Sequence, residues 1–251
     1  METNTNKPEL TIITHNQKLP HYSNSSLSLP AKPEAAKELS SLSLAGHLIA
    51  HKTINTNKIR AILSKAWKTT SGVSVNDVGD NLFLFRFNIE DDRQTILDLA
   101  PWFVEGFLLV LKPCSTLTLI WNIDSTWSPF WVQVHNLPPD WMYQENADTI
   151  GNQLGKLLET ELLVKGSLCW NKFLRLKVHV DVNEPLLYGF YLDCRPNPDM
   201  WIDFKYEKLQ DYYYGCGKLG HARCQCTSPI HHKSPLHRFH LDPADLALGS
   251  K

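Results

Sequence analysis

The stretch GVSVNDVGDNLFLFRFN, residues 72–88, decides the fold of this chain. Apolar and polar residues alternate on both sides of Gly79 and Asp80, and this period of two indicates a pair of β-strands joined by a tight turn. Phe83, Phe85 and Phe87 share one face of the second strand. A row of large apolar rings favours burial, so we expect a hairpin whose phenylalanines lie in a hydrophobic core.

The segments on either side of this hairpin complete a βαββαβ order. Apolar residues recur at helical spacing in NKIRAILSKAW, with Asn57 as the expected N-cap, and a later helix should end before Pro101. The expected strand, helix, hairpin, helix and strand lie at residues 45–53, 57–67, 72–88, about 90–99 and 106–113. This order builds an antiparallel sheet with helices on one face, as in ferredoxin-like and RNA-recognition-motif folds. We predict an α+β domain over residues 43–115.

Alternating aromatic residues in the third strand also occur at the base-stacking positions of RNA-recognition motifs. The stretch DNLFLFRF, residues 80–87, lacks the basic residue and the glycines of that signature. A role in the core is therefore the favoured interpretation of these phenylalanines.

A second, small α+β region is expected over residues 116–207. Its strand, proline-rich turn, helix and three further strands are expected at residues 130–134, 136–140, 146–154, 156–164, 173–182 and 200–209. In FLRLKVHVDV, apolar residues alternate with polar ones that include Arg175 and Lys177, so one face of this strand meets water. These two cations either contact phosphates or are simply solvated, and solvation is the more usual role.

The composition places the chain among globular proteins, with 251 residues, 43% hydrophobic residues and a formal net charge of −1. The whole chain therefore lacks the basic excess that marks many nucleic-acid-binding proteins. Residues 212–241 differ, because this segment contains no Asp or Glu but includes Lys218, Arg223, Lys233 and Arg238. It forms a local basic patch.

Residues 1–42 carry Ser, Asn and Pro without helical or strand periodicity, which predicts a disordered arm. A tail that results from an erroneous gene model is the alternative. No apolar stretch approaches the roughly 18 residues that span a bilayer, and the first residues lack a secretory signal. We expect an intracellular protein with no membrane partner, and no sorting motif decides between nucleus and cytoplasm.

The stretch YYYGCGKLGHARCQC, residues 212–226, nearly matches a zinc knuckle of the form C-x2-C-x4-H-x4-C. Cys216, His221 and Cys226 satisfy three ligand positions, and Tyr213 stands at the first. Three thiolates and one imidazole close a tetrahedral zinc site, whereas a phenol is a poor zinc ligand. Zinc is therefore a candidate cofactor whose fourth ligand is missing from the motif. Cys224, His231 and His232 are candidate substitute ligands, and a cysteine cluster without metal is the alternative.

The residues around these ligands suit single-stranded nucleic acid. Tyr214 offers an aromatic plane for an unpaired base, Leu219 lies in the loop, and Lys218 and Arg223 supply cations for phosphates. The tyrosines at 212–214 could instead pack against the preceding strand. We take residues 208–228 as the knuckle and residues 229–251 as a flexible tail.

Taken together, several segments resemble plant retrotransposon-derived proteins that join a DUF4283 domain to a CCHC-type zinc knuckle. The similarity covers about residues 43–227, and its markers, in chain order, are NLFLFRF, ILDLAPWFVEGFLLVLKPC, FWVQVHNLPPDWMYQENADTIGNQLGKLLE, FLRLKVHVDVNEPLLYGF and WIDFKYEKLQDYYYGCGKLGH. The resemblance implies a gag-like protein that binds single-stranded RNA or DNA, with self-association left open. The chain stops soon after the knuckle, so it is expected to be a fragment or a degenerate copy.

Two other classes of function compete with this interpretation. A protein-interaction or structural relic, whose knuckle no longer holds zinc, is favoured by Tyr213 and by the near-neutral net charge. An enzyme is not expected. Cys216, His221 and Cys226 could formally hold a catalytic zinc, but no general base lies in a recognisable motif.

Overall fold

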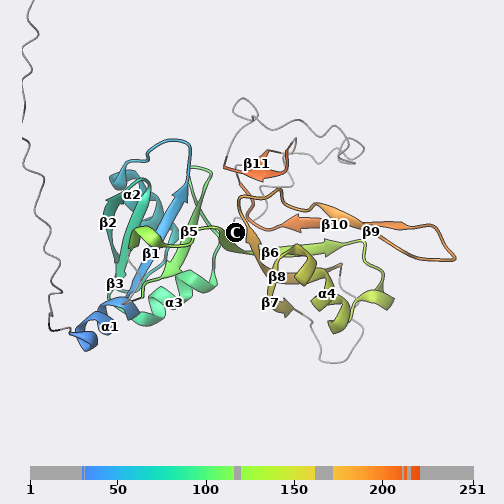
Figure 1. The fold of residues 1–251 in the computed structure, drawn as a ribbon, viewed down its shortest axis with the longest axis horizontal. Helices are drawn as coiled ribbons and strands as arrows, with labels where there is room; N and C mark the ends of the chain where they lie inside the picture. Colours follow the sequence, from blue (N-terminus) through green and yellow to red (C-terminus); the bar gives the residue numbers. More distant parts are fainter. Residues whose placement is uncertain are drawn as a thin grey trace, which may run out of the picture. The chain divides into compact units, whose positions relative to one another are not determined.

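The computed structural model describes residues 30, 32–115, 120–161, 172–210, 212–213 and 216–220 (Figure 1). These residues form two five-stranded antiparallel sheets and one two-stranded sheet. The strand orders are β2-β3-β1-β5-β4, β7-β8-β6-β10-β9 and β11-β12. Both larger sheets belong to the same compact unit of the chain. None of the helices in the described parts is long and apolar enough to cross a membrane.

The first sheet and its helices confirm the expected α+β domain. In chain order its elements are β1 (Ser43–Ile49), α2 (Thr56–Ala66), β2 (Val73–Gly79), β3 (Leu82–Phe87), α3 (Glu90–Asp98), β4 (Trp102–Val104) and β5 (Phe107–Pro113). The order is βαββαβ with one addition, because β4 forms an extra strand at the edge. It was not expected, since three residues are too few to show a strand period.

The core of this domain lies between the sheet and the two helices, and the aromatic side chains dominate it. Phe83, Phe85 and Phe87 are at most 1% exposed, which confirms the core interpretation. Trp67, at the end of α2, lies 5.0 Å from Phe85 between ring centroids. The expected N-cap was wrong by two residues, because Asn55 Oδ1 accepts the hydrogen bond from the backbone N–H of Asn57 at 2.8 Å.

A helix precedes the first strand, where the sequence led us to expect an irregular arm. Pro33–Ser41 form α1, and no residue of this helix is buried. The segment begins with proline, which suits a first helical turn, and continues with Glu, Ala and Lys, which are good helix formers. Leu39 is the one large apolar residue of this nine-residue helix, so the sequence pattern did not indicate a buried helical face. Residues 1–29 and 31 lie outside the described residues.

The second sheet repeats the strand order of the first. Its elements are β6 (Trp127–His135), α4 (Gln144–Leu154), β7 (Lys156–Glu161), β8 (Phe173–Asp181), β9 (Gly189–Leu192) and β10 (Met200–Tyr206), with short 3₁₀ helices η1 (Ile120–Asn122) and η2 (Pro139–Trp141). When the elements are matched in chain order, β6, β7, β8 and β10 occupy the places of β1, β2, β3 and β5. The edge strand β9 was not expected.

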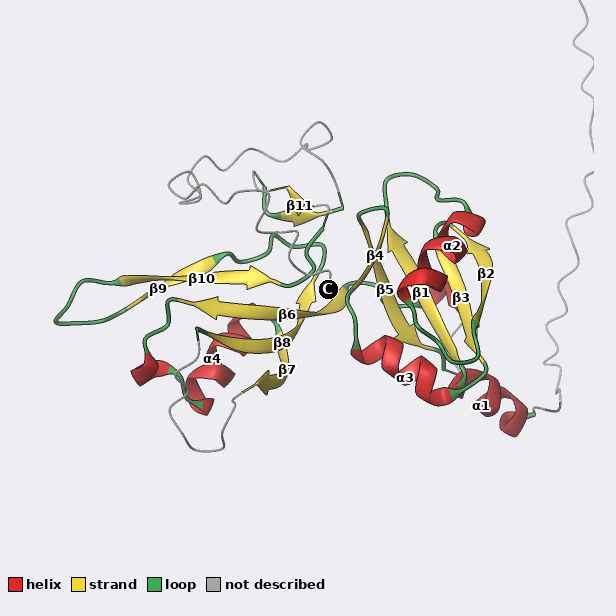
Figure 2. Ribbon diagram, turned by 180° about the vertical axis from the view of Figure 1, so that it is seen from behind, coloured by secondary structure: helices red, strands yellow, loops and turns green. Residues whose placement is uncertain are grey.

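The two sheets differ in their helices, which are drawn in red in Figure 2. The first sheet has α3 between β3 and its last two strands, whereas the chain between β8 and β9, residues 182–188, contains no helix. The core that contains β6, β8 and α4 instead includes Leu108 and Val110 of β5, and Ile49 and Phe103 pack against it. Residues of the first domain therefore complete the core of the second region.

Candidate functional site

The first half of the knuckle motif folds as a short hairpin. β11 (Tyr212–Tyr213) pairs with β12 (Lys218–Leu219), and Tyr213 lies opposite Lys218. The backbone oxygen of Tyr213 accepts hydrogen bonds from the N–H groups of Cys216, at 3.3 Å, and Gly217, at 2.9 Å. Gly217 has φ +77°, a conformation that favours glycine. The glycine therefore lets the chain turn back directly after the cysteine.

This hairpin packs onto the body of the protein through residues that the sequence did not single out. The backbone N–H of Leu186 donates to the oxygen of Gly217 at 2.8 Å. A Cβ added at Gly217 would lie 3.1 Å from Pro185, and one added at Gly220 would lie 3.3 Å from Ile49 Cγ2. Two glycines of the motif thus allow close packing as well as turning. No sequence signal links Ile49 or Pro185 to the knuckle.

The ligand positions are only partly within the described residues. Cys216 is 7% exposed, and its Sγ lies 3.8 Å from the backbone oxygen of Tyr213, so the residue at the first ligand position presents a carbonyl to it. The described residues hold no group of three or more His, Cys, Asp or Glu side chains that could bind a metal ion. The other predicted ligands, His221, Cys224 and Cys226, lie outside the described residues.

The predicted nucleic-acid-binding residues divide in the same way. Lys218 is half-buried in β12, and Leu219 is 7% exposed and belongs to the core of the second sheet. Tyr212 also packs against that core, as the alternative interpretation of the tyrosines expected. Leu219 therefore anchors the hairpin. Tyr214 and Arg223 lie outside the described residues.

The two cations of β8 are engaged within the protein. Arg175 binds Glu207 through Nε at 2.8 Å and Nη2 at 2.9 Å, and Glu161 through Nη1 at 2.6 Å. Its guanidinium lies 3.8 Å from the ring centroid of Trp131, and the hydrogen bonds from Arg175 to Glu207 raise the pKa of the guanidinium. Lys177 Nζ donates to the backbone oxygen of Asp98 at 3.0 Å. These contacts leave Arg175 and Lys177 poorly placed to bind phosphates.

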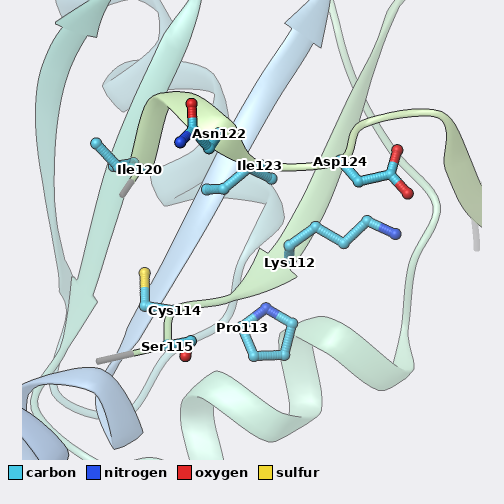
Figure 3. A pocket seen from close by; sticks show the side chains of 8 residues that line it. All are labelled: Lys112, Pro113, Cys114, Ser115, Ile120, Asn122, Ile123 and Asp124. Atoms are coloured by element: carbon cyan, nitrogen blue, oxygen red, sulfur yellow. The ribbon is translucent and has the colours of Figure 1, made fainter. Parts of the chain in front are cut away.

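A pocket of about 340 Å³ opens where β5 ends. Its lining side chains come from residues 112–115 and, on the other side, from residues 120 and 122–124 (Figure 3). Burial raises the pKa of the Cys114 thiol, which disfavours the nucleophilic thiolate. Near the pocket, His47 Nδ1 and Ser125 Oγ are 2.8 Å apart, which ties the connecting segment to β1. We find no pairing of a nucleophile with a base among the described lining residues.

Two family models match segments of the chain. Residues 36–117 match the model described as "Domain of unknown function (DUF4283)", and residues 180–228 match the model described as "Zinc knuckle". The chain therefore resembles DUF4283 domains in its first part and zinc knuckles in a later part, and each match covers less than half of its length. The DUF4283 match contains the whole first sheet. The zinc-knuckle match begins at the end of β8 and includes β9 and β10, so the knuckle follows β10, the strand next to the edge strand β9.

A relative and several solved structures are similar to this chain. An uncharacterized protein of Arabidopsis thaliana is 22% identical over 152 residues, which are 59% of this chain and 45% of the relative. The chain thus spans about half the length of this curated relative. The solved structures include the RNA binding domain of Hrp1 in complex with RNA, at 11% identity and a TM-score of 0.25, covering 67% of this chain and 98% of that one.

Other solved structures are similar to the same degree. The RNA recognition domains 1 and 2 of Sex-lethal from Drosophila melanogaster are 15% identical, with a TM-score of 0.25, and cover 55% of this chain and 85% of that one. The three N-terminal RNA binding domains of the yeast splicing factor Prp24 are 13% identical, with a TM-score of 0.26, and cover 66% of each chain. Scores this low carry no argument about function, and the strand order supports the fold class instead.

Proposed function

We propose that this chain is a gag-like protein of plant retrotransposon origin that binds single-stranded RNA or DNA and has no catalytic activity. The zinc-knuckle match to residues 180–228 carries the proposal. This match overlaps the first part of residues 212–241, a segment that contains Lys and Arg but no Asp or Glu. Backbone phosphates attract such a segment without regard to sequence, so binding is expected to be weakly selective and sensitive to salt.

In this proposal zinc is held by Cys216, His221 and Cys226, with Cys224 as a substitute for the missing fourth ligand. Bound zinc would close the loop between its ligands and so fix the cations of the segment in place. The turn at Gly217 supports the idea, because it places Cys216 at the start of a compact loop. Self-association of the folded body is part of the same proposal.

The second candidate is a protein-interaction module whose knuckle holds no zinc. Tyr213 favours it, because the first ligand position offers a backbone oxygen to Cys216 where a knuckle would offer a second thiolate. Native mass spectrometry separates the two candidates. One zinc per wild-type chain would support the first. Zinc in the Tyr213→Cys variant alone would support the second, and loss of that zinc in a Tyr213→Cys/Cys216→Ser variant would verify the site.

Nucleic-acid binding is tested independently of zinc by the salt dependence of oligonucleotide affinity. Replacing Lys218, Arg223, Lys233 and Arg238 by Gln should weaken binding and reduce the slope of log K against log salt by roughly 2 to 3, at about 0.7 for each phosphate contact of a single strand. The control replaces four exposed lysines elsewhere, Lys32, Lys37, Lys65 and Lys68. Equal slopes for the two variants would contradict the proposal.

A further inference from the structure

One end of the second sheet carries a row of aromatic side chains on the face that points away from α4. Phe173 lies opposite His135 in the β6–β8 pair, with 5.0 Å between their ring centroids. Trp201 lies opposite Tyr191 in the β9–β10 pair, with 4.8 Å between centroids, and Tyr188 is 5.7 Å from Trp201. We call these five residues the distal face.

The distal face and the core lie on opposite sides of the same strands. Val134, Leu174 and Ile202 are at most 2% exposed and share the core with α4. Their neighbours His135, Phe173 and Trp201 point the other way, because successive side chains of a strand alternate between faces. Tyr191 is 65% exposed. The aromatic rings of this face are thus available from solvent, most of all at Tyr191.

Hydrogen bonds hold Trp201 and His135 in position, and Tyr191 and Phe173 each pack against one of these two rings. Trp201 Nε1 donates to Asp203 Oδ1 at 2.7 Å, and Asn136 Nδ2 donates to Asp203 Oδ2 at 2.7 Å. Gln133 donates through Nε2 to Glu207, so its Oε1 accepts from His135 Nε2 at 2.9 Å. Both oxygens of Asp203, the acidic residue in the row, are therefore occupied. Preorganised rings lose little conformational entropy when a ligand stacks on them.

Two exposed cations flank the rings. Lys172 directly precedes Phe173, and Lys205 lies opposite Gln133 in the β6–β10 pair. Neither lysine has an ion-pair partner within 4 Å among the described residues. Both add to the effect of burial in lowering the pKa of His135. Asp203, on the same face, acts in the opposite direction and raises that pKa.

The equivalent face of the first sheet does not offer such a surface. Leu108 and Val110 of β5 are each 1% exposed and belong to the core of the second sheet. His47 of β1 is tied to Ser125. We compare the face of each sheet that points away from its own helices. In the first sheet this face is covered by the second region, whereas in the second sheet the described aromatic residues of this face are open to solvent.

We propose that the distal face is a second contact surface for single-stranded nucleic acid, in addition to the knuckle. Unpaired bases stack on Tyr191 and Phe173, and Lys172 and Lys205 contact the phosphates between them. The strands β8 and β9 are three strand spacings apart, about 14 Å, so the two rings take different bases of one strand. This inference rests on the proposed function, because it assigns a surface to the same ligand.

The test measures binding of a fluorescently labelled oligouridylate to the full chain by anisotropy at low salt. Tyr191→Ala should weaken binding about fivefold to tenfold, since stacking on an aromatic ring contributes that much or more per base. Tyr143→Ala is the matched control, because Tyr143 precedes α4 and is 46% exposed. A Lys172→Gln/Lys205→Gln variant should lower the salt slope by roughly 1, whereas a Lys65→Gln/Lys68→Gln variant should not.

The outcomes separate this inference from the proposed function. If the wild type binds no oligonucleotide, the proposed function fails and the inference fails with it. If the wild type binds and Tyr191→Ala binds equally well, the inference alone is overturned. The same holds if Tyr191→Ala retains binding but loses self-association in sedimentation, because the face would then be a protein contact. Phe173→Ala, checked for folding by circular dichroism, repeats the test at the other ring.

Discussion

The two five-stranded sheets share one strand order, but different elements cover their faces. The first sheet packs α2 and α3 on one face, and its other face contributes Leu108 and Val110 to the core of the second sheet. The second sheet has α4, lacks a counterpart of α3 in residues 182–188, and keeps its distal face open. The face that points away from the sheet's own helices is therefore buried against the second region in the first sheet and exposed to solvent in the second sheet, although the strand order is the same.

The absence of one helix explains much of this difference. A sheet needs its apolar face covered, and one helix of eleven residues covers only part of a five-stranded sheet. The remaining part is covered by residues of the first domain and by Leu219 of the knuckle hairpin. Phe103 and Phe130, with ring centroids 6.4 Å apart, are one such contact. The second region is thus expected to depend on the first for its stability.

The largest loss of stability is expected at Leu108, and it tests whether the second face of the first sheet is buried. If this residue joins the two sheets, Leu108→Ala should lower the free energy of unfolding by about 2–5 kcal/mol, as for other buried leucines. Urea unfolding followed by tryptophan fluorescence measures the change. Leu158→Ala is the control, because Leu158 of β7 is 43% exposed and its truncation should change stability by less than about 0.5 kcal/mol. Equal effects would mean that the first sheet has an open face after all.

A smaller effect is expected on the outer face of the second sheet. Arg175→Met keeps an apolar stem over Trp131 but removes the hydrogen bonds to Glu207 and Glu161. With the side chain of Arg175 30% exposed, solvent screening reduces this contribution to roughly 1–2 kcal/mol. Thermal unfolding at pH 7 measures it. The Arg195→Met variant, which removes the exposed pair with Asp193, should show no measurable change.

The pH dependence of the Arg175 contact sharpens that prediction. Burial alone would raise the pKa of Glu207, but the hydrogen bonds from Arg175 and Gln133 outweigh it, so the pKa lies below 4.5. A carboxyl whose pKa is lower in the folded state stabilises fully above its unfolded pKa, and the stabilisation is lost as pH falls through the folded pKa. The gap between wild type and Arg175→Met should therefore narrow below about pH 4.5. If the difference in stability between the two proteins did not change with pH, it would arise from packing and not from the charge of Glu207.

The sequence predicted the elements that have a clear period. The hairpin at 72–88, the helices at 57–67 and 90–99 and the alternating strand at 173–182 correspond to β2, β3, α2, α3 and β8. The edge strands β4 and β9, with three and four residues, are too short for a period to be visible. Their pairing depends on a neighbouring strand that sequence pattern does not reveal.

The candidate site was less predictable than the fold. The spacing of Cys216, Gly217 and Gly220 pointed to a turn, and both glycines have positive φ. Nothing in the spacing indicated that Leu219 would be buried against the second sheet, because that contact joins distant parts of the chain. The distal face was also missed. Its rings lie on or beside four strands, β6, β8, β9 and β10, and only the strand register brings Phe173 beside His135 and Tyr191 beside Trp201.

The smallest expected effect is a change in the pKa of a histidine with salt concentration. It distinguishes the covered face from the open face, because the pKa values of their histidines are lowered by different causes. Burial lowers the pKa of His47 on the covered face. On the open face, burial also lowers the pKa of His135, Lys205 and Lys172 lower it further, and Asp203 opposes them with a smaller contribution. Salt screens exposed charges but does not alter burial. Raising the salt concentration should therefore move the pKa of His135 upward and leave that of His47 unchanged, as measured by NMR titration of the ring protons.

The same titration links the two histidines to stability. A histidine whose pKa is lowered by folding takes up protons more readily in the unfolded state, so stability falls as pH drops below the unfolded value of 6.5. At high salt, His135 should contribute less to this loss of stability at low pH, whereas the contribution of His47 should stay the same. His47→Gln should then flatten the dependence on pH equally at both salt concentrations, whereas His135→Gln should flatten it more at low salt than at high salt, since burial still acts on His135 at high salt. Identical behaviour of the two variants would mean that the lysines beside His135 do not act on it, and that the open face lacks the positive potential that a nucleic-acid strand requires.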